Sequence, residues 1–207
     1  MTLLANPTEI QIFGDGTLSG IPFSGTWSQS LKAPKLASQV VASMELSAAS
    51  LKALNVEVPS GAIDGKAIAN LTLRMFEKEP VLFEFSSNLK GLSLNVPPLK
   101  WQKPKSLLGE INVKGAFSKP ITIDNFVFRA PGLSAMGKIN FEASGLKSIF
   151  ISDLTVGEWL SAEAKLTNRG VGVPMQVLLT NGVMDLRKLS QEKANGSAIA
   201  KVEASLL

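Results

Sequence analysis

The strongest constraint on the fold of this chain is an alternation of apolar and polar residues, broken by turn residues about every ten positions. A period of two is typical of β-strands with one buried face and one solvated face. Because the connections are short, and parallel strands need crossovers of about a dozen residues, the strands are expected to pair antiparallel in a meander. The alternation is clearest in segments 107–117, 121–130, 133–143, 148–156 and 160–166.

Local signals refine this prediction at three places. The apolar register shifts at Asp124 and Asn125, which predicts a β-bulge. The pair Asp15-Gly16 within "GDGTLSG" predicts a hairpin turn between two strands. Segment 160–166, "LSAEAKL", contains helix-favouring Ala and Glu, but its alternation and the preceding Gly157 favour a strand.

Two short helices are also predicted. One spans Ser47 to Asn55, with Ser47 as its N-cap and Leu51 and Leu54 on one face. The other runs from Asp185 to about Lys193. Both are too short to cover the apolar face of a large sheet. That face therefore needs a second sheet, closure into a barrel, or a ligand to shield it from water.

Composition argues against several functions. The chain has no His and no Cys, so it lacks the commonest general base, thiol nucleophiles and the usual metal ligands. We expect no metal and no cofactor. The net charge of +4 comes from Lys and Arg residues that are scattered singly, whereas nucleic-acid binders concentrate such charge in a stripe.

Carboxylates give no catalytic signal either. Glu77, Glu79 and Glu84 are the nearest to an acid–base group, but Glu84 lies between Phe83 and Phe85 and so faces the opposite, solvated side. The sequence also has no run of about 18 apolar residues that would predict a membrane-spanning helix. We therefore expect a non-enzymatic protein.

Two segments carry a resemblance to a known family. The stretch "LKALNVEVPSGAIDGKAIANLTLRM" and the later "LKGLSLNVPPLKWQKPKSLLGEINVKG", with the strand series ending in "VMDLRKL", resemble AsmA-like (YhdP/TamB-type) bacterial envelope proteins. The resemblance covers roughly residues 40–190 and rests on Pro97-Pro98-Leu99-Lys100-Trp101, Lys103-Pro104 and Met184-Asp185-Leu186-Arg187.

The resemblance implies a fold, a place and a role. Members are similar to bridge-like lipid transfer proteins, in which a long sheet curls into a taco-like groove with a hydrophobic inner side. They are anchored in the inner membrane, extend through the periplasm and carry phospholipid towards the outer membrane. Residues 1–207 would then be a single β-groove segment of a longer chain, with its anchor elsewhere and phospholipid acyl chains as its partner.

The predicted groove-lining residues share one property, an apolar side chain on the alternating face. Each one alone is better explained by ordinary core packing, and only a continuous stripe favours lipid. The alternative is a closed β-sandwich, a structural or adhesive module that binds protein partners at the cell surface. The predicted lining residues are Leu71, Leu73, Phe83, Phe85, Leu92, Leu94, Ile111, Val113, Ile121, Ile123, Phe126, Phe128, Ile139, Phe141, Ile149, Ile151 and Val177.

Overall fold

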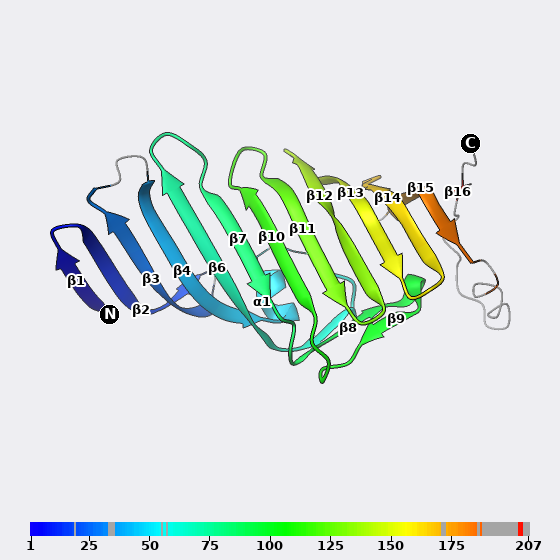
Figure 1. Ribbon diagram of the computed structural model, residues 1–207, viewed down its shortest axis with the longest axis horizontal. Coiled ribbons are helices and arrows are strands. Elements are labelled where there is room, and N and C mark those ends of the chain that lie inside the picture. Colours follow the sequence, from blue (N-terminus) through cyan, green and yellow to red (C-terminus); the bar gives the residue numbers. More distant parts are fainter. Residues whose placement is uncertain are drawn as a thin grey trace.

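The protein is an all-β molecule built on one long antiparallel sheet (Figure 1). A computed structural model describes residues 1–18, 20–32, 36–54, 56, 58–170, 173–185, 187 and 203–204. The sheet has the strand order β1-β2-β3-β4-β6-β7-β10-β11-β12-β13-β14-β15-β16 and is not closed into a barrel. The first twelve strands in this order are antiparallel neighbours, which confirms the predicted meander.

The strands follow the predicted alternation closely. The long sheet contains β1 (Thr2–Asn6), β2 (Glu9–Leu18), β3 (Ile21–Ser30), β4 (Leu36–Leu46), β6 (Ala67–Phe76), β7 (Leu82–Ser87), β10 (Glu110–Ala116), β11 (Thr122–Ala130), β12 (Leu133–Glu142), β13 (Gly145–Val156), β14 (Leu160–Thr167) and β15 (Gln176–Met184). The short β16 (Glu203–Ala204) pairs in parallel with β15. Segment 160–166 is thus a strand, and the register shift between Ile123 and Phe126 confirms the predicted bulge.

Two long excursions interrupt the meander and together form a second sheet. The connection from β4 to β6 contains β5 (Ile63–Gly65), and the connection from β7 to β10 contains β8 (Leu92–Val96) and β9 (Trp101–Lys103). These three strands pair in the order β5-β8-β9. Figure 1 shows β8 and β9 at the lower ends of the long strands, where β4 also bends. The sequence did not predict this second sheet.

The first excursion begins with the predicted helix. Helix α1 (Ala48–Ala53) has Ser47 as its N-cap, and Ser47 and Ser50 form a reciprocal capping box. Leu51 packs against the core, whereas Leu54 at the C-cap is 40% exposed, so only one of the two predicted leucines is buried. Among the described residues, no helix is long and apolar enough to cross a membrane. The second predicted helix, Asp185 to Lys193, lies almost entirely outside the described residues.

The predicted hairpin turn at Asp15-Gly16 is wrong. Strand β2 continues through both residues to Leu18, which pairs with Ile21 of β3. Gly20, with φ at +81°, lies in the turn instead. Gly16 lies opposite Phe23, and a Cβ at Gly16 would come within 3.0 Å of the Phe23 ring. Gly16 is therefore a strand glycine that makes room for an aromatic neighbour, and not a turn residue.

The crossing between the two sheets requires glycine at two positions. Gly65 ends β5 and Gly91 precedes β8, each with φ at +91°. A Cβ at Gly65 would lie 2.3 Å from the Gly91 carbonyl oxygen, and a Cβ at Gly91 would lie 2.3 Å from the Lys66 carbonyl oxygen. Only glycine allows the two backbones to pass this closely where the chain leaves the long sheet.

Trp101 and Lys103 fix the small sheet in place. The Trp101 ring is buried edge-on against Phe128, and its indole N–H donates to the Pro131 carbonyl at 2.8 Å. The Lys103 side chain is 1% exposed and donates from Nζ to the carbonyls of Leu89 and Leu92, both at 2.8 Å. A third, longer bond reaches the Pro104 carbonyl at 3.3 Å, so all three ammonium hydrogens have acceptors.

Candidate functional site

The apolar face of the long sheet is only partly covered. Strand registers align the side chains of this face in three cross-strand rows, which we call the lower, middle and upper rows in order of increasing distance from the small sheet. The lower row contains Phe23, Met44, Ala69, Ser87, Ile111, Phe128, Ala135, Leu154 and Ala162. The small sheet and α1 cover it, and most of these residues belong to two clusters that also include Leu92, Trp101 and Leu51.

The upper row crosses all twelve antiparallel strands without interruption. It contains Leu3, Ile12, Trp27, Val40, Leu73, Phe83, Gly115, Ile123, Ile139, Ile149, Leu166 and Val177. Each side chain is paired in register with the next, so the row is a continuous apolar surface. Apart from Gly115, none of these residues is fully buried, and only Leu166 packs against the two core clusters. The upper row is therefore uncovered by the described part of the chain.

Most of the predicted lining residues share this face. Leu73, Phe83, Ile123, Ile139, Ile149 and Val177 lie in the upper row, and Phe141 follows Ile139 on the same side of β12. Leu71, Phe85, Val113, Phe126 and Ile151 lie in the middle row, while Ile111 and Phe128 lie in the covered lower row. Alternation thus identified a real shared face, but could not show which part of it is covered.

Two predicted residues do not line this face, and a third lies just outside the paired strands. Leu92 and Leu94 belong to β8 of the small sheet, where Leu92 is 1% exposed in the core and Leu94 pairs with Ile63. They belong to the small sheet that covers the lower row, because the chain leaves the long sheet after Ser87. Ile121 precedes β11 in the connection from β10 and is 40% exposed.

The sequence prediction missed the contribution of the first four strands. Ile12, Trp27 and Val40 extend the upper row from β6 back to Leu3 of β1. Alternation in "EIQIF" is a signal that could have identified Ile12. Trp27 and Val40 lie in less regular segments, where the sequence alone does not fix the facing side.

An aromatic pair lies where the upper row lacks a side chain. Gly115 leaves a gap between Phe83 and Ile123, and a Cβ there would come within 2.8 Å of the Phe83 ring. Phe117, in the connection after β10, packs on Phe83 with ring centroids 4.8 Å apart and is 50% exposed. The Phe83 ring therefore lies over the glycine, and Phe117 adds an exposed ring at the rim.

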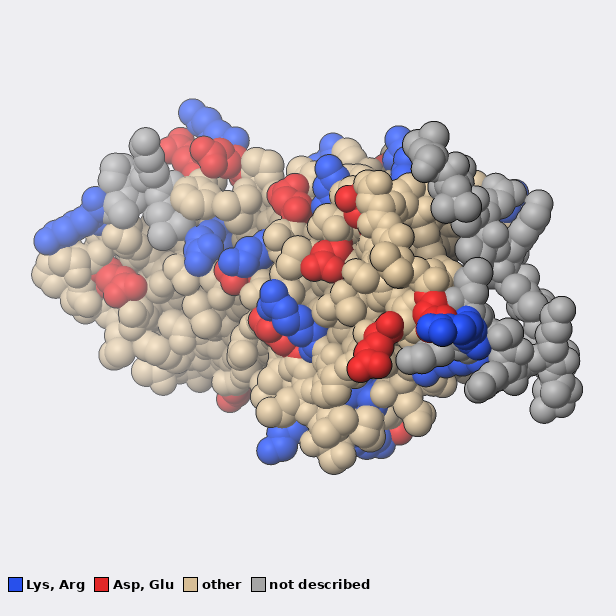
Figure 2. All heavy atoms as spheres, turned by 45° about the vertical axis from the view of Figure 1, so that its right-hand side comes forward, with Lys and Arg blue, Asp and Glu red and all other residues tan. Residues whose placement is uncertain are grey.

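Ion pairs lie on the opposite, outer face of the long sheet. On the outer face Lys114 pairs with Glu84 at 3.0 Å and Lys66 pairs with Glu45 at 2.8 Å. Glu84 pairs in register with Thr72 and Lys114 on the face opposite Phe83 and Phe85, which confirms its predicted outward position. The hydrogen bond from Lys114 lowers the pKa of Glu84. Figure 2 shows the charged side chains in small groups of mixed sign on the visible face. The upper row itself contains no ionisable residue.

The molecule offers few other functional signals. Among the described residues, no group of three or more Asp and Glu side chains is placed to hold a metal ion. Comparison with known proteins finds no matching family, no matching curated protein and no matching solved structure. The function must therefore be inferred from the surface of the long sheet.

Proposed function

We propose that the uncovered part of the apolar face binds the acyl chains of phospholipid. The observation that carries this proposal is the upper row, an apolar strip that crosses twelve strands and is not covered by any described residue. Strands in a sheet are about 4.8 Å apart, so a row of this kind is roughly 50 Å long. Such a strip is long enough for a lipid tail to lie along it, across the strands.

The energetics favour a long apolar ligand. Burying one methylene stabilises a complex by about 0.8 kcal/mol, and a tail of about sixteen carbons lying on an open strip buries roughly half its surface, for a gain of about 6 kcal/mol. Apart from the indole N–H of Trp27, the strip offers no hydrogen-bonding side chain that would fix the ligand at one position. Binding would therefore tolerate sliding along the strip.

The AsmA-like resemblance gives this proposal a biological setting. In that setting the chain is a periplasmic segment, held at the inner membrane through an anchor outside this sequence, and it contributes to phospholipid transport between the two membranes and to envelope integrity. The proposal gives the chain no catalytic role. It is supported by the open meander and its one-sided apolar strip, both of which a lipid groove requires.

Bound lipid can be sought directly. The protein is extracted gently from its own membranes, and native mass spectrometry then measures co-purified phospholipid. Trp27 is an internal probe because it lies in the upper row, whereas Trp101 and Trp159 pack with the covered cluster. In the Trp101→Phe/Trp159→Phe background, brominated phospholipid is expected to quench the remaining fluorescence. Absence of lipid together with absence of quenching would refute the proposal.

A matched pair of variants localises the binding. Ile123→Asp places a carboxylate in the upper row, and Thr122→Asp places one on the outer face at the preceding residue of the same strand. Ile123→Asp is expected to abolish lipid co-purification, while Thr122→Asp retains it. Circular dichroism checks that both fold. If both variants retain lipid, the strip is not the binding surface, and a protein partner on a lipid-free strip would favour the adhesive module instead.

A further inference from the structure

Three connections lie side by side at the ends of the long strands that are farthest from the small sheet (Figure 1). They join β10 to β11, β12 to β13 and β14 to β15. The strand registers bring them to the same edge, because Thr122 pairs with Asn140 and Ser148 pairs with Thr167. The side-chain amide of Asn168 donates to a carbonyl near the start of β13 at 2.7 Å, which holds the third connection against the second.

These connections combine exposed apolar side chains with exposed basic ones. Phe117, Ile121 and Val173 are 50%, 40% and 43% exposed. Lys119 lies between the first two in the chain, and Arg169 precedes the third. Among the described residues, Lys119 and Arg169 have no ion-pair partner. We call these five residues the upper rim.

The upper rim is continuous with the upper row. The Phe117 ring packs on Phe83 of that row with ring centroids 4.8 Å apart, and Ile121 lies two residues before Ile123 of the same row. The backbone N–H of Phe117 donates to the Val81 carbonyl at 2.8 Å, which fixes the chain where the exposed ring begins. An acyl chain can therefore pass from the rim to the strip over apolar side chains.

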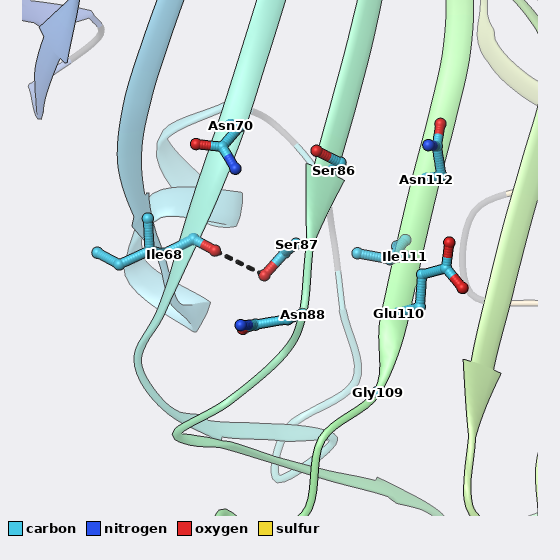
Figure 3. Close-up of a pocket in the computed structure, with 9 residues that line it drawn as sticks. All are labelled: Ile68, Asn70, Ser86, Ser87, Asn88, Gly109, Glu110, Ile111 and Asn112. Carbon is cyan, nitrogen blue, oxygen red and sulfur yellow. Dashed lines mark hydrogen bonds between the residues drawn. The ribbon is translucent and has the colours of Figure 1, made fainter.

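The opposite, lower ends of the strands differ in charge and in surroundings. Leu108 is 57% exposed there, but the nearby Lys105 pairs with Asp64 at 2.7 Å. The ends of β6, β7 and β10 diverge around an open hollow of about 360 Å³ with mostly polar lining residues. A hydrogen bond of 2.7 Å from the Ser87 hydroxyl to the Ile68 carbonyl spans part of it (Figure 3). The small sheet also separates this end from the upper row.

We infer that the upper rim docks on the surface of an anionic phospholipid bilayer and admits acyl chains sideways to the upper row. The inference rests on the proposed function. Apolar side chains of interfacial segments insert among lipid head groups, and Lys and Arg near an anionic leaflet are attracted to it. Lys119 and Arg169 are available for such contacts, because no described acid neutralises them.

Acidic side chains limit the extent of the docking surface. Glu142, at the end of β12, has Lys147 within 4.0 Å and so adds little net charge to the rim. The β6–β7 connection carries Glu77 and Glu79 with one lysine, Lys78. Its net negative charge places the boundary of the surface between β7 and β10.

The absence of cysteine from the sequence makes the orientation on a bilayer measurable. Val173→Cys and Leu108→Cys introduce single labelling sites at opposite ends of the strands. Each carries a fluorophore whose emission shifts to the blue in apolar surroundings. Vesicles of three parts phosphatidylethanolamine to one part phosphatidylglycerol are expected to shift the label at position 173 and leave the label at position 108 unchanged. A shift at position 108, or at neither position, overturns the inference.

Charge and apolar variants have matched controls at the lower end. Lys119→Glu/Arg169→Glu is expected to weaken binding to the same vesicles, measured by co-sedimentation, about tenfold or more, while exposed Lys90→Glu leaves it unchanged. Phe117→Ser is also expected to weaken binding, whereas Leu108→Ser does not. Circular dichroism checks that all four fold. Equal binding by the rim variants and their controls would refute the docking surface.

Two readouts separate this inference from the lipid strip itself. Quenching of Trp27 by brominated phospholipid in detergent micelles reports on the strip, whereas co-sedimentation with vesicles reports on the rim. If Trp27 is quenched but vesicles are not bound, docking is refuted and the strip stands. If the rim binds vesicles but Trp27 is not quenched by either form of lipid, the proposed function fails and docking stands.

Discussion

The lower and upper parts of one apolar face differ in what covers them. Lower-row residues such as Leu154 and Ala162 are buried under the small sheet, whereas upper-row residues on the same strands, such as Ile149, stay half-buried. The upper row is at least as apolar as the lower row, which contains Ser87 and three alanines. The difference therefore comes from the two excursions, which fill one end of the face and leave the other available to a ligand.

The largest expected effect compares two residues of β13 directly. Leu154→Ala removes a side chain that is 7% exposed in the covered cluster, and we expect a loss of about 3 kcal/mol in the free energy of unfolding. Ile149→Ala in the upper row is expected to cost about 1 kcal/mol, because its side chain is already partly hydrated. Urea denaturation measures the two values. Equal losses would mean that the upper row is as well covered as the lower row.

Substitution of Lys103 tests how the small sheet is held against the long sheet. Lys103→Met removes three hydrogen bonds to backbone carbonyls, including those of Leu89 before β8 and Leu92 at its start. We expect a loss of about 2 kcal/mol in the free energy of unfolding. Heteronuclear spectra should show the largest changes in the small sheet, and lipid binding by the upper row should persist. If Lys103→Met is as stable as the natural protein, Lys103 does not hold the small sheet in place.

The same lysine predicts a pH dependence of stability. Burial lowers the pKa of Lys103 below its usual value of 10.5, so the unfolded chain binds this proton more tightly than the folded one. Stability from this group therefore rises with pH between the lowered pKa and 10.5 and is constant below that window. Denaturation at several alkaline pH values should show a steeper rise for the natural protein than for Lys103→Met. Parallel curves would contradict the pKa shift.

Substitution of Phe117, at the edge of the upper row, is expected to change the free energy of unfolding less. Phe117→Ala removes the ring that packs on Phe83, and because Phe117 is half exposed we expect a loss of about 1 kcal/mol or less. Thermal denaturation measures this loss. If Phe117 forms part of the lipid surface, the variant also retains less phospholipid. A loss of several kcal/mol would instead show that this end of the face has a tightly packed core.

The smallest effect concerns the outer face. Glu84→Gln breaks an exposed ion pair with Lys114 and is expected to cost only a few tenths of a kcal/mol at neutral pH. Since the pKa of Glu84 is lowered from 4.5, its contribution is present above that value and is lost as the pH falls through the folded pKa. Acid titration of the two proteins should therefore converge at low pH. A persistent gap there would mean that the substitution acts through packing instead.

Sequence patterns predicted the strands better than they predicted side-chain contacts between different strands. The alternation in segment 133–143, the bulge at Asp124 and Asn125, and the Ser47 cap all correspond to observed features, because each depends on a few adjacent residues. The hairpin at Asp15-Gly16 failed for a tertiary reason. Gly16 makes room for the ring of Phe23 on the next strand. This contact cannot be inferred from the Asp15-Gly16 pair alone.

The sequence by itself determined that this chain forms antiparallel strands with one apolar face, since side-chain direction alternates with a fixed period of two along any strand. It could not determine which strands of that kind join the long sheet. Leu92 and Leu94 alternate like their neighbours, yet Gly91 and the buried Lys103 place them in the cover. Only the tertiary structure decides where an apolar face is buried and where it is open, because burial depends on which distant segments meet.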